Sequence, residues 1–196
     1  MSNPVILEEI QGKIIVRFNR PELRSPLSID VLDRLTDSVE KASKRPDIDA
    51  LIFTGVGNVF ASGADLREIA DVGPDGARGF ALRGQRLMQT ISELGPTTIA
   101  AINGICFGGA LDLALACDER IVSPESVMSH PGADLGIITG WGGTQRLPRL
   151  VGEAIALEMF YTAKRVSAAE ALRIGLVDAV NVDPLEYALN SISKNS

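Results

Sequence analysis

The stretch from residue 97 to residue 117 constrains the fold more than any other part of this 196-residue sequence. It is apolar and about as long as a membrane span, but a cluster of glycines and the carboxylate of Asp112 interrupt it. A carboxylate in hydrocarbon is costly, and clustered glycines favour a turn over a continuous helix. The pattern therefore predicts a buried strand over residues 98–102, a glycine loop over 104–109 and a buried helix through 111–115.

Strands and helices alternate through the rest of the chain. The opening apolar alternation predicts a hairpin over residues 5–18, and Ser28 can cap a helix that ends near Pro46. Strands that alternate with helices indicate an α/β fold with parallel pairing. At this length we expect one core domain, residues 1–182, followed by a short helical tail, residues 183–196. The same patterns predict strands over 49–54, 120–123, 127–129 and 176–180 and helices over 80–94, 145–150, 153–161 and 167–174.

Composition and charge narrow the possible partners. The chain is 45% hydrophobic and 22% charged, which is typical of a folded globular protein. Its 19 Lys and Arg stand against 25 Asp and Glu, and a chain that binds nucleic acid needs a basic face, so no nucleic acid is expected. Two cysteines and one histidine fit neither a disulfide framework nor a zinc cluster, so no metal is expected. With neither a secretory signal nor a membrane segment, the expected location is the cytoplasm.

Two short motifs that often carry chemistry are incomplete here. Gly55-Val56-Gly57 follows a predicted strand, but Phe60 stands where a dinucleotide-binding fingerprint needs its third glycine. The segment around Ser62 lacks the first glycine of a nucleophile elbow, and the single histidine gives little basis for a triad. The sequence therefore predicts a plain turn at the first motif and no nucleophile at Ser62.

Two loops of small residues are more informative. Residues 61–66 and 104–110 each leave a strand and open a helix, so both can expose backbone N–H groups. Two such donors aimed at one carbonyl oxygen would form an oxyanion hole, aided by the positive end of the helix that starts near Gly109. Close packing between strand and helix, which glycine also permits, is the structural alternative. Spacing alone leaves both interpretations open.

Asp112 lies in the first turn of the helix that follows the second loop. A carboxylate there is stabilised by the helix dipole, so it could be a simple N-terminal charge. The residues around it are apolar, which predicts a helix buried nearly all round. A buried acid has a reason to be there, and proton transfer is one such reason.

Several segments together carry a resemblance to a known family. They include GGALDL at residues 108–113, FASGADL at 60–66 and GGTQRL at 142–147. NRP at 19–21 and the segment over 168–177 fit as well, in order and in spacing. The chain resembles the crotonase family, the enoyl-CoA hydratase/isomerase proteins, over roughly residues 4–190. Matches that are this numerous and ordered are more specific than any single glycine motif.

The resemblance implies a spiral of repeated ββα units and an acyl-coenzyme A thioester as substrate, with no cofactor. The N–H groups of Ala64 and Gly109 would be the oxyanion donors, and Asp112 the acid/base of a hydratase/isomerase-type enzyme. The resemblance also implies a homo-oligomer, trimer or hexamer. Against the family pattern, this chain is expected to be a short member that lacks most of the C-terminal helices. For Trp141, core packing and a subunit contact remain alternatives to lining the acyl pocket. The residues expected around the substrate are Arg24, Ala61, Ser62, Asp65, Leu66, Phe107, Gly108, Gly132, Leu135 and Trp141.

The departures from the family pattern concern the reaction itself. Family hydratases resemble one another in carrying two glutamates, and in this sequence those positions are Asp112 and Gly132. Gly132 cannot transfer a proton, although it could open space for another substrate or a water. His130 and Asp134 flank the gap and are candidates to fill it, but a histidine at a strand end is often structural. The alternatives to a hydratase/isomerase are a non-catalytic acyl-CoA-binding protein and an acyl-CoA hydrolase or decarboxylase.

Overall fold

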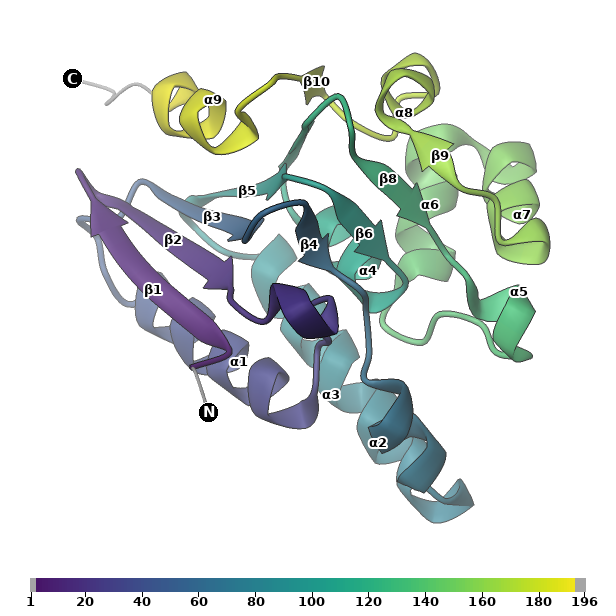
Figure 1. Cartoon of the computed structure of the whole chain (residues 1–196). Helices are drawn as coiled ribbons and strands as arrows, with labels where there is room; N and C mark the ends of the chain where they lie inside the picture. The colour runs from purple at the N-terminus through teal and green to yellow at the C-terminus, as the bar shows by residue number, and fades with distance from the viewer. Residues whose placement is uncertain (1–2, 193–196) are drawn as a thin grey trace.

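The computed structural model describes residues 3–192 and holds two β-sheets, one of six strands and one of four (Figure 1). The larger sheet has the order β1-β2-β3-β5-β7-β10, with an antiparallel β1–β2 pair and parallel neighbours elsewhere. The smaller sheet has the order β4-β6-β8-β9, in which β8 and β9 are antiparallel. The strands are β1 (Val5–Ile10), β2 (Lys13–Phe18), β3 (Ala50–Gly55), β4 (Val59–Ala61), β5 (Thr97–Ile102), β6 (Ile105–Phe107), β7 (Glu119–Val122), β8 (Val127–Ser129), β9 (Val166–Ser167) and β10 (Ala179–Val180).

Three successive strand pairs build a spiral. The first strand of each pair, β3, β5 or β7, lies in the larger sheet, and the second, β4, β6 or β8, lies in the smaller sheet. A helix follows each pair: α2 (Leu66–Asp71), α4 (Gly109–Ala116) and α5 (Gly132–Leu135). The predicted α/β class with parallel pairing is confirmed, and the repeat is the ββα unit that the resemblance implies.

Alternate positions of the central strands face two separate hydrophobic clusters, as the two-residue period of a strand requires. On β3, Leu51 and Phe53 belong to the main core, whereas Ala50 and Ile52 belong to the smaller cluster. The main core contains side chains of α1 (Ile29–Ser43), α3 (Pro74–Ser92) and α4. Helix α9 (Pro184–Ser191) packs Ala188 into the smaller cluster and so covers the other face of the sheet. The last part of the expected tail, residues 193–196, lies outside the described residues.

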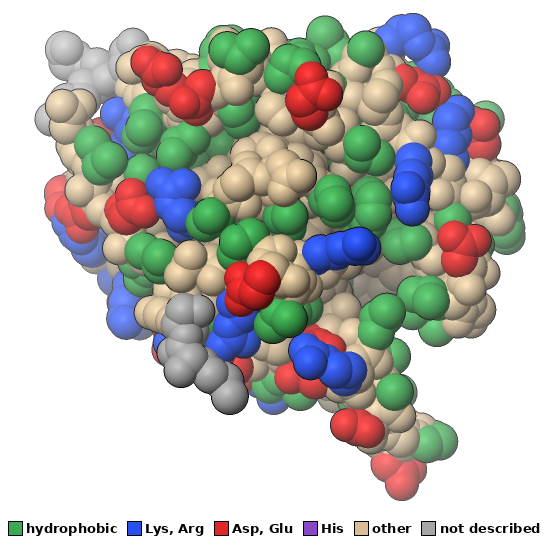
Figure 2. Space-filling model, in the orientation of Figure 1, with side chains coloured by type: hydrophobic (Ala, Val, Ile, Leu, Met, Phe, Trp, Pro, Cys, Tyr) green, Lys and Arg blue, Asp and Glu red, His purple; other side chains and the backbone are tan. Residues whose placement is uncertain are grey.

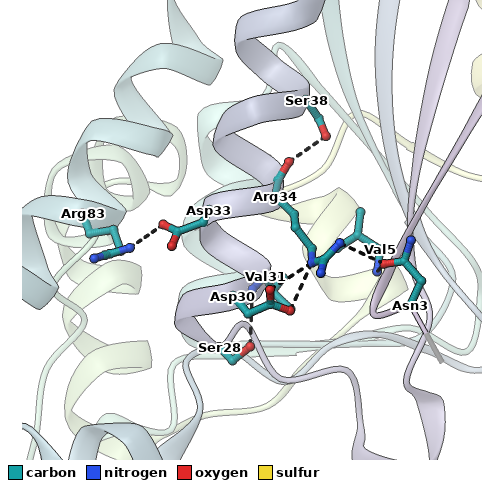
Figure 3. Close-up of polar contacts among 9 residues, drawn as sticks. All are labelled: Asn3, Val5, Ser28, Asp30, Val31, Asp33, Arg34, Ser38 and Arg83. Atoms are coloured by element: carbon teal, nitrogen blue, oxygen red, sulfur yellow. Dashed lines mark hydrogen bonds and ion pairs between the residues drawn. The ribbon is translucent and has the colours of Figure 1, made fainter. Parts of the chain in front are cut away.

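Polar contacts fix helix α1 at its N-terminal end (Figure 3). The Ser28 hydroxyl accepts a hydrogen bond from the backbone N–H of Val31 at 3.4 Å, so Ser28 caps the helix as predicted. Farther along, Asp33 pairs with Arg83 of α3. That pair ties α1 to a helix that lines the cavity described below.

Three predicted elements differ from the structure. The loop predicted over 104–109 contains strand β6, because its residues pair with β8. Helix α3 begins at Pro74, ahead of the predicted start at residue 80, since its exposed first turns carry no apolar period that a sequence pattern could detect. The strand predicted over 176–180 is limited to Ala179–Val180, because Leu176 and Val177 turn into the main core instead.

The remaining helices are short and cover the C-terminal half of the smaller sheet (Figure 1). No helix within residues 3–192 is long and apolar enough to cross a bilayer. The remaining helices are α6 (Gly143–Val151), α7 (Glu153–Thr162) and α8 (Ala168–Arg173), and one 3-10 turn, η1 (Pro21–Leu23), follows β2.

Candidate functional site

A cavity of about 740 Å³ opens where the loop after β4 meets the N-terminus of α4. Its wall includes parts of α2, α3, α5 and α7, so segments distant in the sequence converge on it. Figure 2 shows that this face of the molecule is hollowed between the projecting end that carries α2 and the part that carries α5. A concave, largely apolar site of this size suits a small-molecule ligand.

Gly63 brings the two small-residue loops together. Its φ is +88°, and a Cβ built there would lie 2.6 Å from the carbonyl oxygen of Phe107 and 2.9 Å from the nitrogen of Gly109. Any side chain would therefore push the loops apart, and the positive φ independently favours glycine. The first loop is also held from its other side, since the N–H of Leu27 donates to the Gly63 carbonyl at 2.8 Å.

The N–H groups of Ala64 and Gly109 are available to a ligand. Both residues line the cavity, and neither N–H donates a hydrogen bond to any acceptor within residues 3–192. Gly109 is the first residue of α4, so its N–H has no partner inside the helix and lies at the positive end of the helix dipole. Two backbone donors facing one cavity are what an oxyanion hole requires.

Asp112 is fully buried in the first turn of α4 and also lines the cavity. The hydroxyl of Thr139 donates a hydrogen bond to its Oδ2. Burial raises the pKa of Asp112 to about 7, although Thr139 and the backbone of Trp141 act to lower it. A carboxyl group that titrates near neutral pH can serve as a proton donor and as a proton acceptor.

His130 stands next to Asp112, which sequence spacing alone did not reveal. Its Nε2 lies 3.6 Å from Asp112 Oδ1, and its side chain is only 3% exposed. Burial lowers the pKa of His130 to about 4, so the imidazole is neutral at neutral pH. Throughout the described part of the chain, Asp112 Oδ1 and both imidazole nitrogens find no hydrogen-bond partner.

Trp141 packs between two helices and also reaches the cavity. A Cβ on Gly84 of α3 or on Gly109 of α4 would collide with its indole ring, so both glycines make room for it. Phe80 lies 5.6 Å away, measured between ring centroids. The side chain is 3% exposed, so core packing and a place in the cavity wall hold together.

Gly132 lines the cavity but provides less room than the sequence suggests. A Cβ at this position would collide with the carbonyl oxygen of Ile137 and lie 3.1 Å from its carbon. The idea that Gly132 opens space through its missing side chain is therefore wrong, because the 137–138 backbone already fills that direction. Asp134, the other candidate for the missing acid, is exposed at the cavity's edge.

The rim of the cavity carries the remaining predicted residues. Asp65 caps α2 and forms an ion pair with Arg67 at 2.7 Å, which lowers the pKa of Asp65. Arg24, Leu66 and Leu135 are exposed. Ala61 is the exception among the expected binding residues, since it is buried at the end of β4 and is absent from the cavity wall. The others found in the wall are Arg24, Ser62, Asp65, Leu66, Phe107, Gly108, Gly132, Leu135 and Trp141.

Other wall residues were not predicted. Thr139 contacts Asp112, Phe160 of α7 lies 5.2 Å from the His130 ring, and Arg165 lies over the Phe107 ring at 5.8 Å. Their local sequence carries no motif, and only the tertiary fold brings them to the site. Within residues 3–192 no group of three His, Cys, Asp or Glu side chains is placed to hold a metal ion.

Comparison with known proteins identifies the family. The model of the enoyl-CoA hydratase/isomerase family matches residues 8–191. The chain belongs to the enoyl-CoA hydratase/isomerase family. The resemblance seen in the sequence is thereby confirmed, and this protein is an enzyme of the hydratase/isomerase type.

Individual relatives support the same assignment. Crotonyl-CoA hydratase of Syntrophomonas wolfei is 39% identical over 183 residues, which are 93% of this chain and 70% of the relative. Short-chain-enoyl-CoA hydratase of Clostridium acetobutylicum is 39% identical over 94% of this chain and 70% of its own. The crystal structure of enoyl-CoA hydratase from Thermoplasma volcanium superposes with a TM-score of 0.93 at 32% identity. The match covers 100% of this chain and 79% of the Thermoplasma chain.

Proposed function

We propose that this protein stabilises the enolate of an acyl-CoA thioester, with the N–H groups of Ala64 and Gly109 as oxyanion donors and Asp112 as the acid/base. The observation that carries the proposal is that these three residues line one cavity, with both N–H groups free of internal acceptors. The substrate is a thioester with a 2-enoyl chain or its 3-hydroxy counterpart. The steps use only thioester, water and protein groups, so the proposal calls for no cofactor.

Binding of the thioester is assigned to the cavity wall and rim. Phe107, Gly108 and Trp141 would contact the acyl part, since they lie beside the two oxyanion donors in the wall. Arg24 would approach the coenzyme A phosphates from the rim, where it is exposed. We also propose a homo-oligomer, trimer or hexamer, which analytical ultracentrifugation of the purified chain would test.

The decisive experiment measures exchange of the C2 proton of butyryl-CoA in D2O by mass spectrometry. Enolate formation replaces that proton with deuterium, whether or not water adds to a double bond. Asp112→Asn should slow exchange by about 10²-fold or more, because it removes the proton acceptor while preserving shape. Asp134→Asn is the matched control, and its exchange rate should stay within about twofold of wild type because its carboxylate is exposed at the edge.

The opposite results are equally informative. Absence of exchange by the folded wild-type chain would overturn the proposal, as would full exchange by Asp112→Asn. Tight binding of butyryl-CoA without exchange would favour the non-catalytic alternative. Release of free coenzyme A or carbon dioxide would favour a hydrolase or a decarboxylase.

A further inference from the structure

We propose that His130 is the second proton-transfer group of the site, and that it and Asp112 together hold and activate the water that adds to a 2-enoyl thioester. This inference rests on the proposed function, because the water would attack a thioester bound to the Ala64 and Gly109 donors. It assigns a catalytic role to a side chain two residues before Gly132, the position that cannot itself transfer a proton.

The first support is the shortage of hydrogen-bond partners. Among the described residues, Asp112 Oδ1 and the two nitrogens of His130 are buried side-chain atoms with no partner. Leaving a buried polar atom without a partner costs stability, so three such atoms together point to a polar ligand at this position. Both side chains line the cavity, which makes the ligand one that enters with the substrate or from solvent.

The second support is the distance between the two groups. At 3.6 Å, Nε2 and Oδ1 are too far apart for a direct hydrogen bond, but one water molecule can accept a hydrogen bond from the protonated Oδ1 and donate one to Nε2. Gly143 makes this arrangement possible, because a Cβ there would collide with Asp112 Oδ1 and lie 3.1 Å from His130 Cε1. Glycine at residue 143 therefore keeps the space beside Asp112 Oδ1 free of a side chain.

The third support is the chemistry of the pair. Thr139 donates to Oδ2 of Asp112 and so leaves Oδ1 to carry the transferable proton. Burial acts in opposite directions on the two groups, favouring a protonated carboxyl and a neutral imidazole. The resting pair thus holds one acid and one base, which is what addition of water across a double bond needs.

The resulting step balances in atoms and charge. The water oxygen bonds to C3 of the enoyl thioester while one water proton passes to Nε2 of His130. The electron pair of the C2=C3 bond moves to the thioester oxygen, and the N–H groups of Ala64 and Gly109 hold the resulting enolate. Asp112 then gives its proton to C2, and the imidazolium returns a proton to the carboxylate. The net change is addition of one water molecule.

The test separates water addition from enolate formation. Hydration is followed as loss of the conjugated absorbance of crotonyl-CoA, and enolate formation as C2 exchange of butyryl-CoA in D2O. In His130→Gln, hydration should fall by about 10²-fold or more, whereas exchange should stay within about threefold of wild type. The control is Ser129→Ala, since Ser129 is buried next to His130 but bonds to the Ala163 carbonyl and is absent from the cavity wall.

Each other outcome has a defined meaning. Undiminished hydration by His130→Gln overturns the assignment, and so does an equal loss of hydration and exchange, which would make His130 a positioning residue for Asp112. A wild-type chain that exchanges but does not hydrate also overturns it, while the enolate proposal stands. Failure of exchange in the wild type is the separate failure of the proposed function.

A measurement on the wild-type chain keeps the proposal testable if His130→Gln does not fold. His130 is the single histidine of the sequence, so a ¹⁵N-histidine-labelled sample gives one unambiguous pair of imidazole signals. Saturation with 3-hydroxybutyryl-CoA should shift the Nε2 resonance, because the product hydroxyl occupies the position of the attacking water. An unchanged resonance at saturation would overturn the proposal.

Discussion

The two walls of the cavity use glycine in opposite ways. On the donor wall, which holds the proposed oxyanion donors Ala64 and Gly109, Gly63 lets two loops approach so closely that backbone N–H groups face the cavity. On the acid/base wall, which holds Asp112, His130 and Gly132, Gly132 is packed against the Ile137 carbonyl, and the proposed second proton-transfer group is the side chain of His130. The difference shows that a glycine in a binding site can serve either to expose backbone donors or to accommodate neighbouring backbone.

The largest effect is expected from Gly63→Ala, which breaks the donor wall. The new Cβ would meet Phe107 and Gly109 at a φ of +88°, so the two loops must separate. Displacing one oxyanion donor costs about 10²–10³-fold in turnover. Turnover of crotonyl-CoA, measured on a chain whose circular dichroism is unchanged, checks this expectation.

Gly57→Ala is the matched control for that substitution. Gly57 also has a positive φ, +65°, but a Cβ there meets nothing within 4 Å, and the residue is absent from the cavity wall. It should lose about 1 kcal/mol of stability through backbone strain and keep its turnover. Equal turnover in the two variants would mean that the close approach of the loops at Gly63 does not position the N–H groups of Ala64 and Gly109.

The buried Asp112 and His130 of the acid/base wall should give stability two opposing dependences on pH. The folded pKa of Asp112 is about 7, against 3.8 for an ordinary aspartate, so the folded state binds the extra proton and the free energy of unfolding falls as pH rises from about 4 to about 7. The folded pKa of His130 is about 4, against 6.5, so the unfolded state binds the extra proton and stability rises with pH between about 4 and 6.5. In the wild type the two contributions largely cancel.

Single variants remove one contribution each and expose the other. The free energy of unfolding of Asp112→Asn should rise as pH increases from 4 to 6.5. That of His130→Gln should fall as pH increases from 4 to 7. Each profile should change by roughly 3–4 kcal/mol across its window, in opposite directions, measured by urea unfolding at several pH values. Arg146, whose charge also acts on Asp112, is present in both variants. Parallel pH profiles would contradict the burial of an uncharged pair.

The sequence predicted one wall far better than the other, for a physical reason. The donor wall follows from a local pattern, small residues between a strand and the helix that follows it. The acid/base wall depends on tertiary contacts, since Asp112 comes from α4, His130 follows β8, and Thr139 lies in the segment before α6. No local period or motif encodes a distance between such segments, so the sequence left His130 with both a structural and a chemical interpretation.

The smallest effect concerns Gly132, where the sequence suggested open space and the structure shows contact. Gly132→Ala should lower the free energy of unfolding by about 1–3 kcal/mol, because the Cβ meets the Ile137 carbonyl. Gly140→Ala is the control on the same wall, since its Cβ would meet only Ala81 at 3.9 Å, and it should change stability by about 0.5 kcal/mol or less. Equal stability of the two variants in urea unfolding would mean that the 137–138 backbone yields readily.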